Sequence, residues 1–177
     1  RNNCMRIKII ALTLLTGSSI ASIANAADGT INFTGTILSA ACTVTPATGT
    51  QTVPLNSVTT SSLSTAGVTS SPTKFDIVLT SCPSTVSTAT VKFDGPTDSD
   101  NSSILKLTTE PGVATGVGIA LYEKDASTQI PIGTSSTSST LSTTSDTTFT
   151  FYAKYMATKA VTSGPANGST DFTINYN

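Results

Sequence analysis

Apolar residues in this chain recur at every second position, and this spacing limits what the chain can fold into. The clearest example spans residues 149–157 and places on one face Phe149, Phe151, Ala153, Tyr155 and Ala157. Successive side chains of a β-strand point to opposite faces, so this period indicates a strand with one buried face. No window shows an apolar repeat of helical spacing that is long enough to indicate a helix. The chain is therefore expected to be all-β.

Several further segments share this period and are separated by turn signals. The apolar positions of these expected strands are Phe75, Ile77 and Leu79; Ala89, Val91 and Phe93; Val117, Ile119 and Leu121; Ile130 and Ile132; and Phe172, Ile174 and Tyr176. Gly, Pro and Asn cluster between them, for example in Asp94–Pro96 and Asn167–Gly168. Many short strands with regular turns favour a β-sandwich. The Ser/Thr-rich stretches 57–71 and 133–148 are expected to be solvated loops.

The first residues have the pattern of an export signal. Residues 1–4 precede Met5 and are interpreted as upstream, non-native residues. Residues 5–26 combine a basic start, an apolar run too short to span a membrane, and an A-x-A cleavage site ending at Ala26. Removing these 26 residues from the 177 leaves a mature chain the size of one domain. The chain is therefore expected to be exported.

Charge and cysteine content narrow the classes of function. Three of the nine basic residues and none of the ten acidic ones lie in residues 1–26, so the mature chain is acidic, and it has no basic stripe for nucleic acid. Cys42 and Cys82 remain after processing, and in an oxidising compartment such a pair is expected to form a disulfide. The alternative is a two-thiolate metal site, but the chain has no histidine to complete it.

Motifs for catalysis are weak. The absence of histidine excludes Ser-His-Asp and Cys-His chemistry. The sequence Ser71–Lys74 matches S-x-x-K and Ser99–Asn101 matches S-D-N, but Pro72 opposes the helix that this chemistry needs and no K-T-G follows. The acids Asp94, Asp98 and Asp100 surround a turn and are interpreted as a solvated loop. We therefore expect no enzyme activity, no metal and no cofactor.

Residues 29–37 show the same alternation, yet they precede the first mature cysteine. Gly29, Ile31, Phe33, Gly35 and Ile37 share one face, and threonine and asparagine occupy the other. Chain ends are usually frayed unless something ties them down. A strand with this apolar face needs a partner, which is either its own domain or another molecule.

Four blocks of the mature chain resemble the type 1-like fimbrial subunits, the pilins of the chaperone–usher pathway. They are Gly29–Cys42, Gly116–Tyr122, Phe151–Thr158 continuing to Gly164–Asn167, and Asp171–Asn177. The resemblance covers the whole mature chain, with the blocks in the order and at the spacing of the family.

This resemblance implies an incomplete immunoglobulin-like sandwich that lacks its last strand. A donor strand from a neighbouring subunit would complete it, which is a form of strand addition. Residues 27–38 would be the donor extension and residues 39–177 the pilin domain. The donor positions would be Gly29, Ile31, Phe33, Gly35 and Ile37, with Ile31 and Phe33 filling the neighbour's groove.

The same resemblance implies partners and an acceptor site. Phe172, Ile174 and Tyr176 would belong to the acceptor edge, and the carboxylate of Asn177 would anchor a periplasmic chaperone. Other fimbrial subunits, the chaperone and an outer-membrane usher are the expected partners. The expected function is a structural subunit of a fimbria, exported through the periplasm to the cell surface. The alternatives are a minor or tip-associated subunit that adheres to a host receptor, and an extension that folds back onto its own groove.

Overall fold

A computed structural model describes residues 29–177 of the chain. The predicted upstream residues 1–4, the signal peptide 5–26 and the first two residues of the extension lie outside the described residues. The chain divides into two units, residues 1–36 and residues 37–177, and the fold described here is that of the second. Within the described part, no helix is long and apolar enough to cross a membrane.

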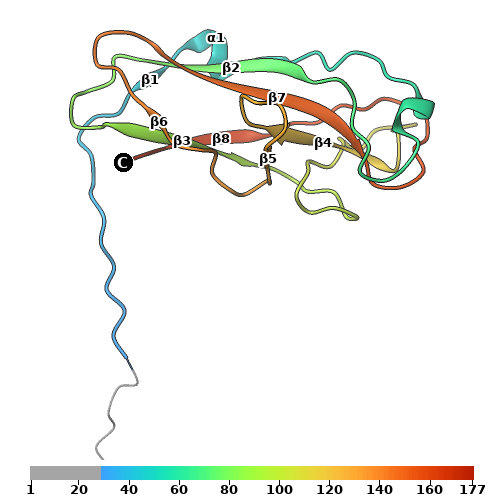
Figure 1. Cartoon of the computed structure of the whole chain (residues 1–177), viewed down its shortest axis with the longest axis horizontal. Coiled ribbons are helices and arrows are strands. Elements are labelled where there is room, and N and C mark those ends of the chain that lie inside the picture. The colour runs from blue at the N-terminus through green and yellow to red at the C-terminus, as the bar shows by residue number, and fades with distance from the viewer. Residues whose placement is uncertain (1–28) are drawn as a thin grey trace, which may run out of the picture. The chain divides into compact units, whose positions relative to one another are not determined.

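Two antiparallel sheets form this unit (Figure 1). The five-stranded sheet has the order β1 (Thr43–Val44), β2 (Thr73–Thr80), β7 (Thr147–Ala157), β4 (Val117–Tyr122) and β5 (Gln129–Ile130). The three-stranded sheet has the order β6 (Ser139–Thr140), β3 (Thr88–Asp94) and β8 (Asp171–Tyr176). A four-residue helix, α1 (Pro46–Gly49), and a 3-10 helix, η1 (Thr60–Leu63), lie in the connections. The predicted all-β sandwich is confirmed, and each predicted segment from residue 75 onward contains a strand.

The core lies between the two sheets and is centred on three phenylalanines. Phe93 of β3 packs edge-on against Phe151 of β7, with ring centroids 5.0 Å apart, and its centroid lies 6.0 Å from that of Phe75 on β2. Phe93 and Phe151 are 1% and 2% exposed. Edge-to-face aromatic pairs add a directional preference to the burial of apolar area. These contacts fix the two sheets face to face.

The predicted disulfide between Cys42 and Cys82 is present. It joins the residue before β1 to the residues that follow β2, and both cysteines are buried. The Tyr176 hydroxyl, near the end of β8, donates a hydrogen bond to the main-chain oxygen of Cys42 at 3.5 Å. This contact places an edge strand of each sheet, β1 and β8, on the same side of the sandwich.

Two Ser/Thr-rich or turn-like stretches are more ordered than the sequence predicted. The stretch 57–71 was expected to be a solvated loop, but it contains η1, whose Leu63 is buried, and Thr69 forms an isolated bridge to Met156. The stretch 133–148 was expected to be a loop, but 133–141 lies along β3 and contains β6. Main-chain hydrogen bonds and the Ser136 hydroxyl hold this irregular edge, and apolar periodicity cannot detect such contacts.

Candidate functional site: an open sheet edge beside an apolar groove

The two edges of the three-stranded sheet differ. On one edge, β6 and the residues before it pair with β3. The other edge is β8, which has β3 as its single strand neighbour among the described residues. An edge strand presents a row of unpaired N–H and C=O groups and is a template for another strand.

The register shows which residues of β8 have outward-facing main-chain groups. Thr88 and Asn177 exchange both main-chain hydrogen bonds, at 2.9 and 3.1 Å. Opposed residues in an antiparallel pair alternate between bonded and non-bonded pairs. Counting along the ladder from this bonded pair, Phe172, Ile174 and Tyr176 of β8 fall in non-bonded pairs. Their partners on β3 are, in the same order, Phe93, Val91 and Ala89. Their N–H and C=O groups therefore point away from β3, toward the open edge, while their half-buried side chains pack against the core.

A groove with a volume of about 600 Å³ adjoins this edge. Residues 48–55, which follow β1, and residues 166–172, which lead into β8, form its sides. Its apolar lining comes from the core strands and the segment before β4: Phe75, Ile77, Phe93, Leu105, Ile119, Leu121 and Ala153. Within residues 29–177, no main-chain hydrogen bond joins residues 50–58 to another segment. Both sides of the groove therefore contain main-chain groups that a further strand could bond.

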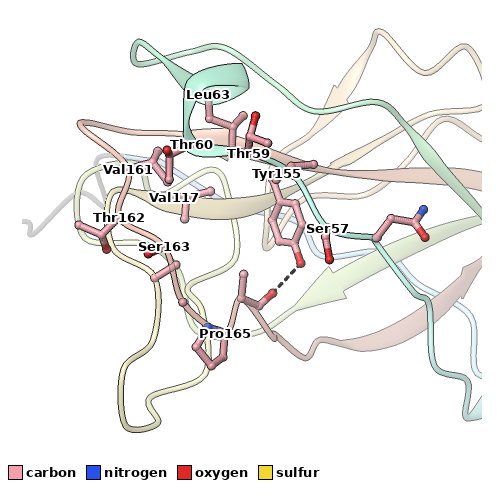
Figure 2. Close-up of a pocket in the computed structure, with 15 residues that line it drawn as sticks. Ser57, Thr59, Thr60, Leu63, Val117, Tyr155, Val161, Thr162, Ser163 and Pro165 are labelled. Carbon is pink, nitrogen blue, oxygen red and sulfur yellow. Dashed lines mark hydrogen bonds between the residues drawn. The ribbon is translucent and has the colours of Figure 1, made fainter.

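A second hollow of about 450 Å³ continues from the first, and the two share Tyr155 and Ala166. Figure 2 shows its lining, in which Leu63 of η1 lies near Val117 and Val161. The Tyr155 hydroxyl donates a hydrogen bond to the Ala166 main-chain oxygen at 2.9 Å, drawn as the dashed line in Figure 2. Burial raises the pKa of Tyr155 above its ordinary value of 10. The bond holds residue 166, which lies at the junction of the two hollows.

The glycine at position 168 lines the groove and lies close to another lining residue. A Cβ atom at Gly168 would lie 2.8 Å from Cδ1 of Ile119, a buried residue that also lines the groove. Any larger residue would have to displace the Ile119 side chain or move the main chain outward. The shape of this side of the groove therefore depends on the absence of a side chain.

The predicted donor residues lie in an extended, exposed segment. Residues 29–37 carry no strand assignment in the described structure, and Ile31, Phe33 and Ile37 are 80%, 91% and 100% exposed. No atom outside the adjacent residues lies within 4 Å of the Cβ position at Gly29 or Gly35. Large exposed apolar side chains in one row indicate a surface that is buried in an assembly.

The predicted acceptor residues are brought together on and after β8. Phe172 lines the groove, whereas Ile174 and Tyr176 lie farther along the same edge. Burial raises the pKa of Tyr176, although its hydrogen bond to Cys42 acts in the opposite direction. The main-chain oxygen of Asn177 accepts hydrogen bonds from the N–H groups of Ser87 and Thr88, each at 3.1 Å. Asn177 is therefore held by the end of β3 in the single chain.

Sequence reasoning missed the side of the groove formed by residues 48–55, and also Leu63, Tyr155 and Gly168 as lining residues. A usable signal was Val53-Pro54-Leu55, in which two apolar residues flank a proline. Proline cannot donate to a ladder and is confined to sheet edges or bulges. The remaining lining residues are ordinary core residues, and the sequence does not reveal that a hollow lies above them.

The site has the properties of a strand acceptor rather than of a reactive centre. Among residues 29–177, no three His, Cys, Asp or Glu side chains lie close enough to hold a metal ion. The groove combines an apolar lining with free main-chain donors and acceptors, which suits an extended peptide with alternating apolar residues.

Known fimbrial proteins are similar to this chain over most of its length. A family model described as "Fimbrial protein" matches residues 31–177. The "Type-1 fimbrial protein, A chain" of Escherichia coli is 36% identical over 97% of this chain and 100% of its own length. Among solved structures, a type I fimbria protein of Burkholderia pseudomallei is 40% identical, with a TM-score of 0.60 over 84% of this chain and 97% of its own. The P pilus rod subunit PapA, at 22% identity, shares the fold, with a TM-score of 0.66 over 78% of this chain and 100% of its own.

Proposed function

Because this chain belongs to the fimbrial protein family and is a structural subunit of a surface fimbria, we propose that its subunits polymerise by exchanging strands. In this proposal, residues 27–38 of one subunit fill the groove of the next and pair with the open edge of β8. Residues 39–177 are the domain that provides the groove. No chemical reaction is involved, because the product is a non-covalent fibre.

One observation supports this proposal above the others: the chain carries both halves of the contact. The groove beside β8 is lined in part by apolar core residues and has unpaired main-chain groups on both sides. The extension has exposed apolar residues at every second position, which is the pattern that such a groove accepts. The donor positions in this proposal are Gly29, Ile31, Phe33, Gly35 and Ile37.

The energetics favour a stable contact. Full burial of a large apolar side chain is worth about 1.5–3 kcal/mol, and Ile31 and Phe33 are both exposed in the single chain. The glycines allow the segment to lie close to the groove, because they add no side chain between the apolar ones. Added main-chain hydrogen bonds would satisfy the outward groups of Phe172, Ile174 and Tyr176.

We further propose that a periplasmic chaperone covers the groove before assembly and that an outer-membrane usher directs the exchange. An exposed apolar groove beside an open strand edge is an aggregation hazard, so an exported subunit needs a temporary cover. The proposed contact residues of the chaperone are Phe172, Ile174, Tyr176 and Asn177. Binding at Asn177 would have to accommodate the hydrogen bonds that its main-chain oxygen receives from Ser87 and Thr88.

The test is to add a synthetic peptide of residues 27–38 to the purified mature protein and to follow thermal unfolding. The peptide is expected to raise the melting temperature, because it binds the folded state and not the unfolded one. A matched peptide carrying Ile31→Asp and Phe33→Asp should leave the melting temperature unchanged. Equal stabilisation by both peptides would exclude the donor role of these two residues.

A further inference from the structure

The edge of the three-stranded sheet opposite β8 is closed along the length of β3, although β6 has two residues. β6 pairs with Thr88 and Ala89. Beyond it, the Gly133 and Ser136 N–H groups donate to the main-chain oxygens of Phe93 and Val91, each at 2.8 Å. Ser135 forms an isolated bridge to Lys92 between these two contacts. Residues 133–141, here called the closing segment, therefore cover an edge that would otherwise accept a strand.

Ser136 completes this edge with its side chain. Its Oγ accepts a hydrogen bond from the Val91 N–H at 2.9 Å and donates to the Thr137 main-chain oxygen at 3.0 Å. Ser136 is 7% exposed, one of two polar residues among the buried positions of the described chain. The hydroxyl replaces the main-chain carbonyl that a regular strand would offer at this point. Without it, a buried N–H group of β3 would lack its acceptor, at a cost in free energy.

Glu123 attaches the closing segment to the other sheet. It follows β4, is 9% exposed, and its carboxylate accepts from the Thr137 N–H at 2.6 Å and from the Thr137 hydroxyl at 3.1 Å. None of the three salt bridges within residues 29–177 includes Glu123. Hydrogen bonds to a carboxylate are stronger than neutral ones, and a buried carboxylate is costly to leave without them. The charge therefore favours the position of the closing segment in which Thr137 faces Glu123.

We propose that Glu123 and Ser136 are positioning residues that keep the β3 edge closed, so that the three-stranded sheet accepts a donor strand at the β8 edge alone. An open β3 edge would be a second strand acceptor, and edge-to-edge pairing there would join subunits laterally. Closure of one edge and openness of the other leaves the three-stranded sheet with one acceptor edge, as an unbranched fibre requires of this sheet. This inference rests on the proposed strand exchange.

The test uses the mature protein and a peptide of residues 27–38 that carries a photoreactive group at position 33. Cross-linked residues are mapped by mass spectrometry in the unaltered protein and in two variants, Glu123→Ala and Ser136→Ala. Both variants are expected to yield cross-links in residues 88–94 and 133–141 at least tenfold above the level of the unaltered protein. The control variant Ser138→Ala, which changes an exposed serine of the closing segment, should stay at that level. Glu123→Gln keeps one acceptor oxygen for Thr137 but removes the charge, and should give cross-links between the levels of the unaltered protein and Glu123→Ala.

The outcomes separate this inference from the proposed function. Cross-links to groove-lining residues such as Phe172 and Ala166 report on strand exchange and also show that a variant is folded. If the unaltered protein gives no groove cross-links, the proposed function fails. If groove cross-links persist and neither variant gains cross-links at the β3 edge, the closing role of Glu123 and Ser136 is wrong. If Glu123→Ala does not fold, Ser136→Ala tests the proposal by itself, because it leaves the Glu123 carboxylate in place.

Discussion

Strand β7 and the extension at residues 29–37 have the same sequence pattern and opposite exposure. The inward residues of β7, from Phe149 to Ala157, are all less than 10% exposed, whereas Ile31 and Phe33 of the extension are 80% and 91% exposed. β7 lies between β2 and β4 in the five-stranded sheet, and the extension carries no strand assignment. The shared period thus predicts which face of a segment is apolar, but not which core will receive it.

The difference between the two segments lies in their place along the chain. β7 lies among the strands of the domain and pairs with β2 and β4, both earlier in the chain, through long registers. The extension precedes Cys42, whose disulfide fixes the start of the sandwich. In our account, a segment that precedes Cys42 adds nothing to the hydrophobic core of its own chain. Its apolar face is instead buried when subunits assemble.

The largest expected difference between the two segments is the loss of stability when one phenylalanine in each is truncated. Phe151→Ala is expected to lower the free energy of unfolding by about 3–5 kcal/mol, because it removes a ring from the centre of the core. Phe33→Ala should change it by less than about 0.5 kcal/mol, as is usual for an exposed position. Urea unfolding of the two monomeric proteins measures both values. A cost at Phe33 as large as that at Phe151 would mean that the extension belongs to its own domain's core.

The disulfide between Cys42 and Cys82 marks the start of the sandwich, and its contribution to stability can be measured. Replacing Cys42 and Cys82 by serine should lower the free energy of unfolding by about 2–5 kcal/mol, because the unfolded chain gains freedom. The same urea unfolding experiment measures it, with reduction of the unaltered protein as a second route to the same state. Free-thiol titration of the exported protein should find no free thiol in the mature chain, and two thiols would contradict the assignment.

The assembly role of the extension predicts an effect on peptide binding affinity that is smaller than the two changes in stability above. In a peptide of residues 27–38, Phe33→Ala should weaken binding to the protein by about 1.5–3 kcal/mol, since one large side chain is no longer buried. Isothermal titration calorimetry gives this difference directly. Thr34→Ala, which changes the opposite face of the same segment, is the matched control and should bind nearly as well as the original peptide. Equal losses at both positions would contradict the alternating contact.

The smallest expected effect is a change in how the stability of the domain depends on pH. Burial acts against ionisation of Asp76 on β2, but hydrogen bonds from Thr150 of β7 and from Lys74 lower its pKa below the ordinary 3.8. A lowered pKa contributes stability that is present above pH 3.8 and is lost as the pH falls through the folded-state value. Asp76→Asn should therefore reduce the loss of domain stability on acidification, as followed by thermal unfolding between pH 5 and pH 2. Residues 29–37 contain no titratable side chain, so this part of the extension adds no such dependence.

Much of the fold could be predicted from the sequence because the strands that build it alternate regularly. The segments around Phe75, Val91, Ile119, Phe151 and Ile174 all form strands with their apolar residues turned toward the core. The cysteine pair was also predictable, since an exported chain with two cysteines has one way to pair them. These features depend on local pattern and on the redox compartment.

The site was less predictable because it depends on which main-chain groups remain unpaired. Nothing in the residues of β8 distinguishes its open edge from its paired edge, since the strand register decides this. The closing segment escaped prediction for a related reason. Its contacts come from the hydroxyl of Ser136 and the carboxylate of Glu123, and polar residues in a Ser/Thr-rich stretch give no periodic signal.

The central claim is that the extension of one subunit occupies the groove of another. The most direct measurement places a photoreactive residue at position 33 of the full chain and assembles fibres from an equal mixture of unlabelled and ¹⁵N-labelled subunits. Mass spectrometry of the cross-linked peptides then reports whether the two partners carry the same label. Our account predicts cross-links from position 33 to groove-lining residues, half of them between differently labelled chains. Cross-links confined to equally labelled chains would show an extension folded onto its own domain and would contradict the account.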